Sequence, residues 1–200
     1  MSVASPVIEL LKVERTYDMG GGNVVHALRG IDLTIRSGEF VAIVGPSGSG
    51  KSTLMYLLGC LDQPSAGSYR LCGEDVGALD DAALSRIRNR RIGYVFQSYN
   101  LLSELDVVEN IGLGLVYAGT APENRRARGA ELATRMGLGQ RLDHKPRELS
   151  GGQMQRVAIA RGLACDPPII LADEPTGNLD QHTGAEIMAL LRELHAQGRT

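Results

Sequence analysis

Apolar and polar residues follow two patterns along the chain, one typical of exposed strands and one typical of buried strands. The alternation over Val7–Val13 predicts an edge strand, and Val24–Leu33 predicts another strand beyond a glycine turn at residues 20–23. A short strand is predicted at Ser68–Gly73. Continuous apolar runs are typical of parallel strands covered on both faces. Such runs occupy Phe40–Val44, Ile92–Phe96 and Ile169–Ala172.

Helical spacing of apolar residues predicts helices after two of these runs. Leu54, Leu57, Leu58 and Leu61 would form one face of a helix from Lys51 to about Leu61. Further helices are predicted from Ser150 to about Ala164 and from Gly184 to about Gln197. Strands that alternate with helices in this way indicate an α/β fold with a mostly parallel sheet and an antiparallel β edge.

The segment from Ser98 to about Arg147 differs from the rest of the chain, because its pattern becomes mostly helical. Breaks are expected at Gly119–Pro122 and at Gly137–Gly139. We interpret residues 98–147 as an inserted α-helical subdomain. Residues 1–200 would then form one domain, with an α/β core built from residues 1–97 and 148–200.

Composition changes this picture little. Hydrophobic residues make up 43% of the chain and charged residues 22%, and the formal charge of −2 provides no general attraction to nucleic acid. The basic run at Arg86, Arg88, Arg90 and Arg91 is better explained as a solvated face than as a nucleic-acid patch. The three cysteines are scattered, which is typical of reduced thiols. With no secretory signal and no apolar run of about 20 residues, membrane association is expected through a partner.

The strongest motif follows the first apolar run. Residues 45–53 match the pattern G-x-x-x-x-G-K-[ST] at every fixed position. They are Gly45, Pro46, Ser47, Gly48, Ser49, Gly50, Lys51, Ser52 and Thr53. Backbone N–H groups of such a loop hold phosphate oxygens at a helix N-terminus. Lys51 would bind the β- and γ-phosphates of ATP and Ser52 would ligate Mg²⁺. A plain glycine turn explains this motif poorly, since a strand is predicted before it and a helix after it.

Polar residues end the other two apolar runs. Asp173 follows Ile169–Ala172 and would reach Mg²⁺ directly or through water. Glu174 is the candidate general base for the water that attacks the γ-phosphate. Gln97 could touch both Mg²⁺ and this water. A lone Asp-Glu pair usually marks an exposed turn, and the apolar run before this one favours the functional interpretation.

A second glycine-rich turn opens the helix after Leu149. Ser150, Gly151, Gly152 and Gln153 would present free N–H groups and the helix dipole to a γ-phosphate. Ser150 also suits a plain N-cap, although two glycines are poor choices for capping alone. Tyr17 could stack on adenine or could be a core aromatic residue.

Together, and in this order, these residues resemble an ATP-binding cassette (ABC) ATPase over essentially the whole chain. The resemblance implies two copies closing head to tail around two ATP molecules, with residues 150–153 touching the ATP of the opposite copy. Asp180 matches the family's dimer-contacting loop. It also implies hydrolysis at Glu174 that reopens the dimer and drives a membrane partner.

Three stretches resemble the macrolide-exporter and lipoprotein-releasing branch: Leu58–Asp62, Phe96–Leu102 and Asp173–Asp180. The resemblance implies a transmembrane permease partner that docks near Gln97–Leu102, although Leu101 and Leu102 could equally pack inside the helical subdomain. Nucleic acid is not an expected partner. The implied location is the cytoplasmic face of the inner membrane, through the permease.

Family members continue past the last helix to a strand that ends in a switch histidine. The chain ends at Thr200, and neither His182 nor His195 matches that position, so we expect the 200 residues to be part of a longer, truncated ATPase. Two other functions stay open: a cassette ATPase acting on DNA or ribosomes, and a nucleotide-binding module without turnover. The interval from Lys51 to Ser150 is too short for the coiled coil of the DNA-repair relatives. A P-loop kinase would leave residues 149–153 unexplained.

Overall fold

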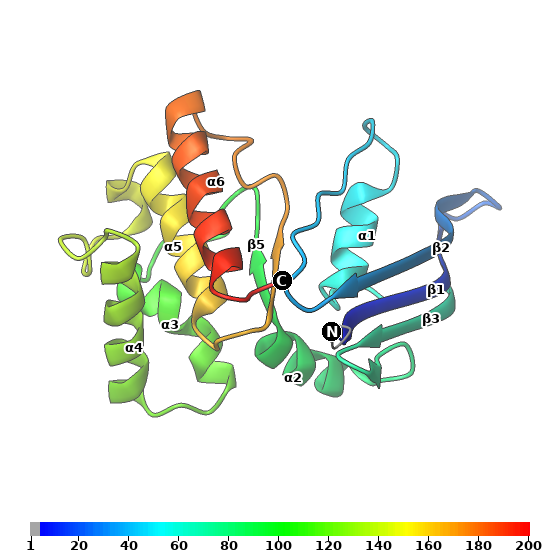
Figure 1. Cartoon of the computed structure of the whole chain (residues 1–200), viewed down its shortest axis with the longest axis horizontal. Helices are drawn as coiled ribbons and strands as arrows, with labels where there is room; N and C mark the ends of the chain where they lie inside the picture. Colours follow the sequence, from blue (N-terminus) through cyan, green and yellow to red (C-terminus); the bar gives the residue numbers. More distant parts are fainter. Residues whose placement is uncertain (1–4) are drawn as a thin grey trace. The chain divides into compact units, whose positions relative to one another are not determined.

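The computed structural model of the chain describes residues 5–200 (Figure 1). The chain forms two compact units, one from the N-terminal part up to Ser85 with Gly198–Thr200, the other from Arg86–Gln197. The predicted helical subdomain lies within the second unit, and its bounds at residues 98 and 147 stay a prediction. Among the residues described, no helix combines the length and apolar character needed to cross a membrane.

The first unit contains a four-stranded antiparallel sheet in the order β2-β1-β3-β4. Its strands are β1 (Pro6–Asp18), β2 (Val24–Arg36), β3 (Ala66–Leu71) and β4 (Glu74–Asp75). The expected strands at Val7–Val13 and Val24–Leu33 are confirmed, and both are longer than predicted. The extension of β1 places Tyr17 in the sheet opposite Val25.

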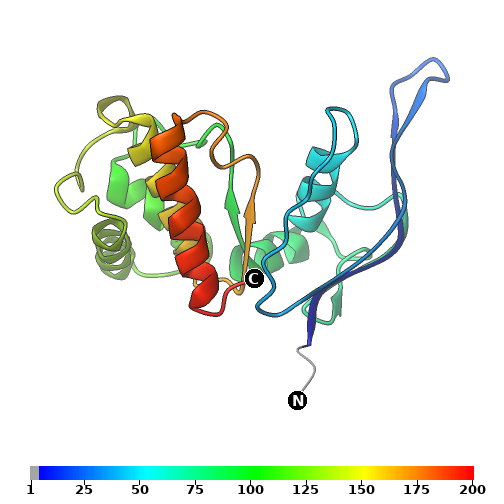
Figure 2. The same cartoon turned by 45° about the horizontal axis from the view of Figure 1, so that its top comes forward.

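Helix α1 (Lys51–Leu58) lies against this sheet (Figure 2). Tyr69 of β3 is buried and donates a hydrogen bond to the carbonyl of Leu58 at 2.8 Å, and its burial raises the pKa of its phenol well above the ordinary value. The helix ends earlier than predicted, because Gly59 and Cys60 leave the helical path and Cys60 has φ 52°. Leu61 is consequently 44% exposed instead of completing an apolar face.

The predicted buried strand at Phe40–Val44 is wrong. No strand is assigned there, and neither sheet in the described part of the chain includes the segment. Val41 is 46% exposed and Val44 is 87% exposed. A parallel strand is buried only when neighbouring strands supply ladder hydrogen bonds and helices cover both faces. An apolar run alone provides neither.

The second unit is built around a parallel pair, β5 (Ile92–Val95) and β6 (Ile169–Ala172), which confirms the other two apolar runs as strands. Helix α5 (Gly151–Leu163) packs so closely on β5 that the two backbones are in contact. A Cβ on Gly93 would lie 2.3 Å from the carbonyl oxygen of Gly162, so only glycine fits there.

The remaining helices complete the second unit (Figure 1). They are α3 (Val107–Tyr117), α4 (Pro122–Arg135), the 3₁₀ turn η1 (Pro146–Glu148) and α6 (Gln181–Ala196). The predicted breaks near residues 119–122 and 137–139 are confirmed. Buried apolar side chains of β5, α3, α4, α5 and α6 share one core, for example Val95, Ile111, Leu132, Ile159 and Ile187. Helix α2 (Asp81–Arg91) carries the basic run and spans the boundary between the units at Ser85 and Arg86; it was not expected from the sequence.

Candidate functional site

The glycine-rich loop of the first unit runs over residues 45–50 and leads into α1 at Lys51. Gly50 has φ 88°, and a Cβ there would lie 2.5 Å from the carbonyl oxygen of Ala27. This close approach of β2 explains why the position needs glycine. The first N–H groups of α1 have no partner one turn earlier, so they can bind an anion.

Lys51 curls back over this loop. Its Nζ donates to the carbonyl oxygens of Gly45 and Pro46, each at 2.8 Å. These bonds hold the ammonium group above the loop, where a phosphate oxygen could replace either carbonyl. The loop and the Ser52 side chain are exposed, which leaves them open to a ligand.

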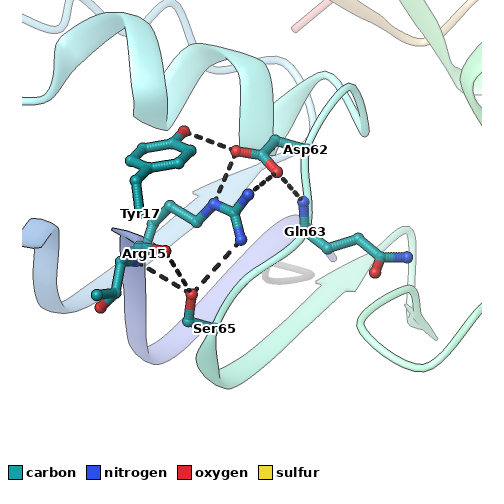
Figure 3. Close-up of polar contacts among 6 residues, drawn as sticks. Arg15, Tyr17, Asp62, Gln63 and Ser65 are labelled. Atoms are coloured by element: carbon teal, nitrogen blue, oxygen red, sulfur yellow. Dashed lines mark hydrogen bonds and ion pairs between the residues drawn. The ribbon is translucent and has the colours of Figure 1, made fainter. Parts of the chain in front are cut away.

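Tyr17 is neither fully buried nor free to rotate. Its hydroxyl donates to Asp62 Oδ2 at 2.7 Å, and the Arg15 guanidinium lies over its ring, 4.6 Å from the centroid (Figure 3). The ring is half-buried, unlike the core aromatic Tyr69, which is 1% exposed. This setting supports a ligand-contacting position better than a core position.

In the second unit, strand register brings two of the predicted residues together. Val95 of β5 pairs with Ala172 of β6, so residues two positions later on each chain segment emerge at the same edge. Those residues are Gln97 and Glu174, and Gln97 Nε2 donates to Glu174 Oε2 at 2.8 Å. Asp173 directly precedes Glu174, and its backbone N–H donates to the carbonyl oxygen of Val95.

The backbone around Glu174 is unusual. Glu174 has φ 44°, in the left-handed region that residues other than glycine seldom adopt. The turn after it is held by Asn178, whose Nδ2 donates to the carbonyl of Gln97 at 2.9 Å. The surroundings therefore stabilise a backbone conformation that costs free energy at any residue other than glycine. Such strained residues are often found at functional sites.

Ser150 caps α5 through a reciprocal pair of bonds with Gln153. Asp180 caps α6 in a similar way, accepting bonds from the backbone and hydroxyl of Thr183 at 3.0 and 2.6 Å. These bonds from Thr183 lower the pKa of the Asp180 carboxyl below its ordinary value. Gly152 connects the two caps, since a Cβ there would lie 2.5 Å from Thr183 Cγ2.

Packing therefore explains one glycine of this turn. Capping and phosphate contact were the only roles predicted for Gly151 and Gly152. The contact with Thr183 connects segments 31 positions apart, and no local pattern indicates it.

Four further polar residues contact predicted site residues or the segments beside them, and no site role was predicted for them from the sequence: Arg15, Asp62, Asn110 and Arg161. Arg161 of α5 donates to the carbonyls of Asn100 at 2.5 Å and Tyr99 at 2.7 Å. Burial lowers the pKa of its guanidinium. Asn110 is fully buried. Its side-chain Oδ1 accepts a hydrogen bond from the backbone N–H of Leu102, and its Nδ2 donates to the carbonyl oxygen of Leu102. A polar residue on the apolar face of a helix was the signal available in both cases.

The predicted residues therefore lie in two groups. The first unit contains Tyr17 and residues 45–53, and the second contains Gln97, residues 150–153, Asp173, Glu174 and Asp180. The structure describes each unit by itself. A Mg²⁺ site that takes Ser52 from one unit and Gln97 and Asp173 from the other stays a prediction.

Comparison with known proteins agrees with the resemblance seen in the sequence. The ABC transporter family matches residues 28–177. An uncharacterized ABC transporter ATP-binding protein of Thermotoga maritima is 55% identical over 97% of this chain and 82% of its own length. The macrolide export ATP-binding/permease protein MacB 2 of Aeromonas hydrophila is 52% identical over 99% of this chain. The pyoverdine export ATP-binding/permease protein PvdT of Pseudomonas savastanoi is 53% identical over 97%.

The chain spans 30% of the length of each of these two export proteins. Among solved structures, the ATP-binding cassette MJ0796 in a dimeric post-hydrolysis state with ADP and Pi has a TM-score of 0.88 and 46% identity. The alignment covers 96% of this chain and 85% of that one. These likenesses confirm the predicted fold class, and they show that the chain belongs to the ABC transporter family as an ATP-binding and ATP-hydrolysing cassette.

Proposed function

We propose that the chain is the motor of an export system of the macrolide-export and lipoprotein-release type. Two copies would close head to tail around two ATP molecules and drive a membrane permease from its cytoplasmic face. The hydrogen bond between Gln97 Nε2 and Glu174 Oε2, formed at matching positions beyond two paired strands, is the observation that carries the catalytic part.

Residues of the first unit would bind the nucleotide. The N–H groups at the start of α1 and the Lys51 ammonium bind phosphate oxygens, and Lys51 exchanges its bonds to Gly45 O and Pro46 O for them. Tyr17 stacks on the adenine base, which a half-buried ring fixed at its hydroxyl can do.

Residues of the second unit would carry out hydrolysis. Glu174 accepts a proton from the attacking water through Oε1, because the Gln97 amide already occupies Oε2. The hydroxyl of Ser52, the carboxylate of Asp173 and the amide oxygen of Gln97 are oxygen donors of the kind that Mg²⁺ prefers. When bound there, Mg²⁺ neutralises charge on the phosphates.

The signature turn would complete the site of the opposite copy. Its helix N-terminus presents the N–H groups of Gly151 and Gly152, and Ser150 and Gln153 satisfy each other's backbone. The dimeric solved structures of related cassettes support this arrangement. Asp180 stands at the N-terminus of the neighbouring helix, next to Thr183.

The exporter assignment is supported by combined ATP-binding/permease relatives. Relatives named for macrolide export and for pyoverdine export are about equally similar to this chain, at 52–55% and 53% identity. This chain is therefore about equally similar to proteins named for different cargoes, which supports a motor that does not itself recognise the cargo. The permease would dock on the loop at residues 97–102, where Leu102 is 48% exposed.

The test is the oligomeric state of Glu174→Gln in the full chain, measured by size-exclusion chromatography with light scattering. We expect ATP to convert the 21.4 kDa monomer to a dimer, because ATP binds but is not consumed. Glu193→Gln, an exposed change on α6, serves as the matched control and should not accumulate dimer.

Hydrolysis is measured on the same variants. Glu174→Gln turning over ATP as fast as the parent would exclude Glu174 as the base. A monomer that binds ATP tightly yet never dimerises would contradict the head-to-tail motor and favour a nucleotide-binding module.

A further inference from the structure

Arg15, Tyr17 and Asp62 form one connected network between β1 and the turn after α1 (Figure 3). Arg15 Nε donates to Asp62 Oδ2 at 2.8 Å, and Arg15 Nη2 lies 2.6 Å from Oδ1. The Tyr17 hydroxyl donates to the same Oδ2 at 2.7 Å. The Arg15 guanidinium also covers one face of the Tyr17 ring. The ring is thus held at its hydroxyl and on one face.

Both oxygens of the Asp62 carboxylate accept hydrogen bonds. Besides Arg15 and Tyr17, the backbone N–H of Gln63 donates to Oδ1 at 2.8 Å. The side chains of Arg15 and Asp62 are 23% and 20% exposed, and their contact is bidentate. The Lys12–Asp32 pair of the same sheet is 78% and 47% exposed. Exposed pairs of that kind contribute little, whereas the Arg15–Asp62 pair has the geometry of a fixed contact.

Ser65 forms hydrogen bonds to the backbone of the same stretch of β1. Its N–H donates to Glu14 O at 2.8 Å, and Thr16 N donates to Ser65 Oγ at 3.1 Å. Both neighbours of Arg15 in the strand are therefore bonded to the segment after α1. The backbone that carries Tyr17 is fixed as firmly as its ring.

We propose that Arg15 and Asp62 are positioning residues that hold Tyr17 ready for the adenine base of ATP. This inference rests on the stacking role of Tyr17 in the proposed function. Arg15 occupies one face of the ring, so the base stacks on the other. A change in the χ1 rotamer of Tyr17 would break the hydroxyl bond to Asp62, and turning the ring about its long axis would disturb its contact with Arg15, so little rotamer entropy remains to be lost when the base binds.

Asp62 also links the two regions that we propose bind the base and the phosphates. It follows α1, and the N-terminus of α1 is the phosphate-binding loop. A carboxylate that joins this helix to Tyr17 sets the separation between the base-binding ring and the phosphate-binding backbone. The competing explanation is that the ion pair only fastens β1 to α1, which would affect stability without affecting recognition of the base.

The experiment compares ATP with inorganic tripolyphosphate, which carries three phosphates and no base, by calorimetric titration of the full chain. Asp62→Asn should weaken ATP binding about threefold to tenfold, the loss expected from a hydrogen bond. It should leave tripolyphosphate affinity unchanged. The matched control Asp32→Asn should change neither. Equal weakening of both ligands by Asp62→Asn, or of neither, would overturn the positioning role.

Tyr17→Phe tests the same inference without disturbing the ion pair. It keeps the ring and removes only the hydroxyl, so it should weaken ATP selectively, and adding Asp62→Asn should then cost less than in the parent. Full additivity of the two changes would overturn the inference.

Tyr17→Ala separates the two levels of the proposal. If it leaves the ratio of ATP to tripolyphosphate affinity unchanged, stacking itself fails and the inference fails with it. If it lowers this ratio while Asp62→Asn and Tyr17→Phe do not, stacking stands and the positioning role alone is refuted.

Discussion

Several of the predicted site side chains are held in fixed positions by hydrogen bonds within the protein. Lys51 is bonded to two carbonyls of its own loop, and Glu174 is bonded to Gln97 in a left-handed backbone conformation. Each arrangement fixes a charged group next to an exposed surface. The Glu174 carboxylate therefore needs little reorganisation when a ligand arrives, which is the basis of electrostatic preorganisation, whereas Lys51 would exchange its two carbonyl partners for phosphate oxygens.

Lys51→Ala should weaken ATP binding about tenfold to a hundredfold, because it removes a hydrogen bond from a charged donor to the phosphates. The unfolding temperature without ATP should change little, since the two carbonyls that Lys51 contacts belong to exposed loop residues. Calorimetric titration and thermal unfolding measure these two effects.

Lys12→Ala provides the matched control, because it removes an exposed lysine from the same unit. It should bind ATP like the parent. ATP affinity unchanged in Lys51→Ala would contradict the role of the glycine-rich loop.

At the scale of elements, the second unit is organised around helix ends. The N-termini of α5 and α6 meet at Gly152 and Thr183, and each helix is capped by its own side chain, Ser150 or Asp180. Further along α5, Arg161 holds the carbonyls of Tyr99 and Asn100. The helix that would contact the opposite ATP is therefore bonded directly to the loop where we propose that the permease docks.

Gly152→Ala should destabilise the chain by about 1–3 kcal/mol, the usual effect of inserting a methyl into a packed contact. The new Cβ would lie 2.5 Å from Thr183 Cγ2, and Thr183 cannot move without losing its two bonds to Asp180. Chemical denaturation measures the loss of stability.

The double variant with Thr183→Ser provides the control, because serine lacks Cγ2 but keeps the hydroxyl. It should recover most of the lost stability. Equal stability of the single and double variants would show that the clash is not the cause.

At the scale of the whole molecule, the predicted site residues fall into two groups, one in each unit of a single chain. Residues 45–53 belong to the first unit and residues 150–153 to the second. In a head-to-tail dimer each complete site would combine residues 45–53 of one copy with residues 150–153 of the other. A symmetric dimer built in this way has two equivalent sites.

Mixing two inactive variants tests this arrangement. Lys51→Ala loses the phosphate loop and Gly151→Asp places a negative charge at the signature turn, so each alone should hydrolyse little ATP. A mixed dimer has one site with both defects and one with none. We expect an equal mixture to recover up to about a quarter of the parent ATPase rate.

Mixing either variant with itself at the same total concentration is the control. A mixture no more active than its components would contradict the shared site.

Local patterns were enough to predict much of the fold and to identify the family. The glycine-rich loop before α1, the capped turn at Ser150 and the Asp-Glu pair after β6 are contiguous stretches, and their residue types and order are sufficient to identify an ABC cassette. Breaks near residues 119–122 and 137–139 were likewise readable, because glycine and proline act on the backbone where they stand.

What joins distant segments was decided by the tertiary structure alone. The register of β5 and β6 brings Gln97 to Glu174, and Asp62 reaches back to Tyr17 across 45 positions. The Phe40–Val44 run shows that the local pattern can also mislead, since its apolar residues do not form the strand that was predicted there. Hydrogen bonds between strands, close helix contacts and ion pairs depend on partners far along the chain. A linear pattern can name the residues that carry the chemistry, but only packing determines which of them meet.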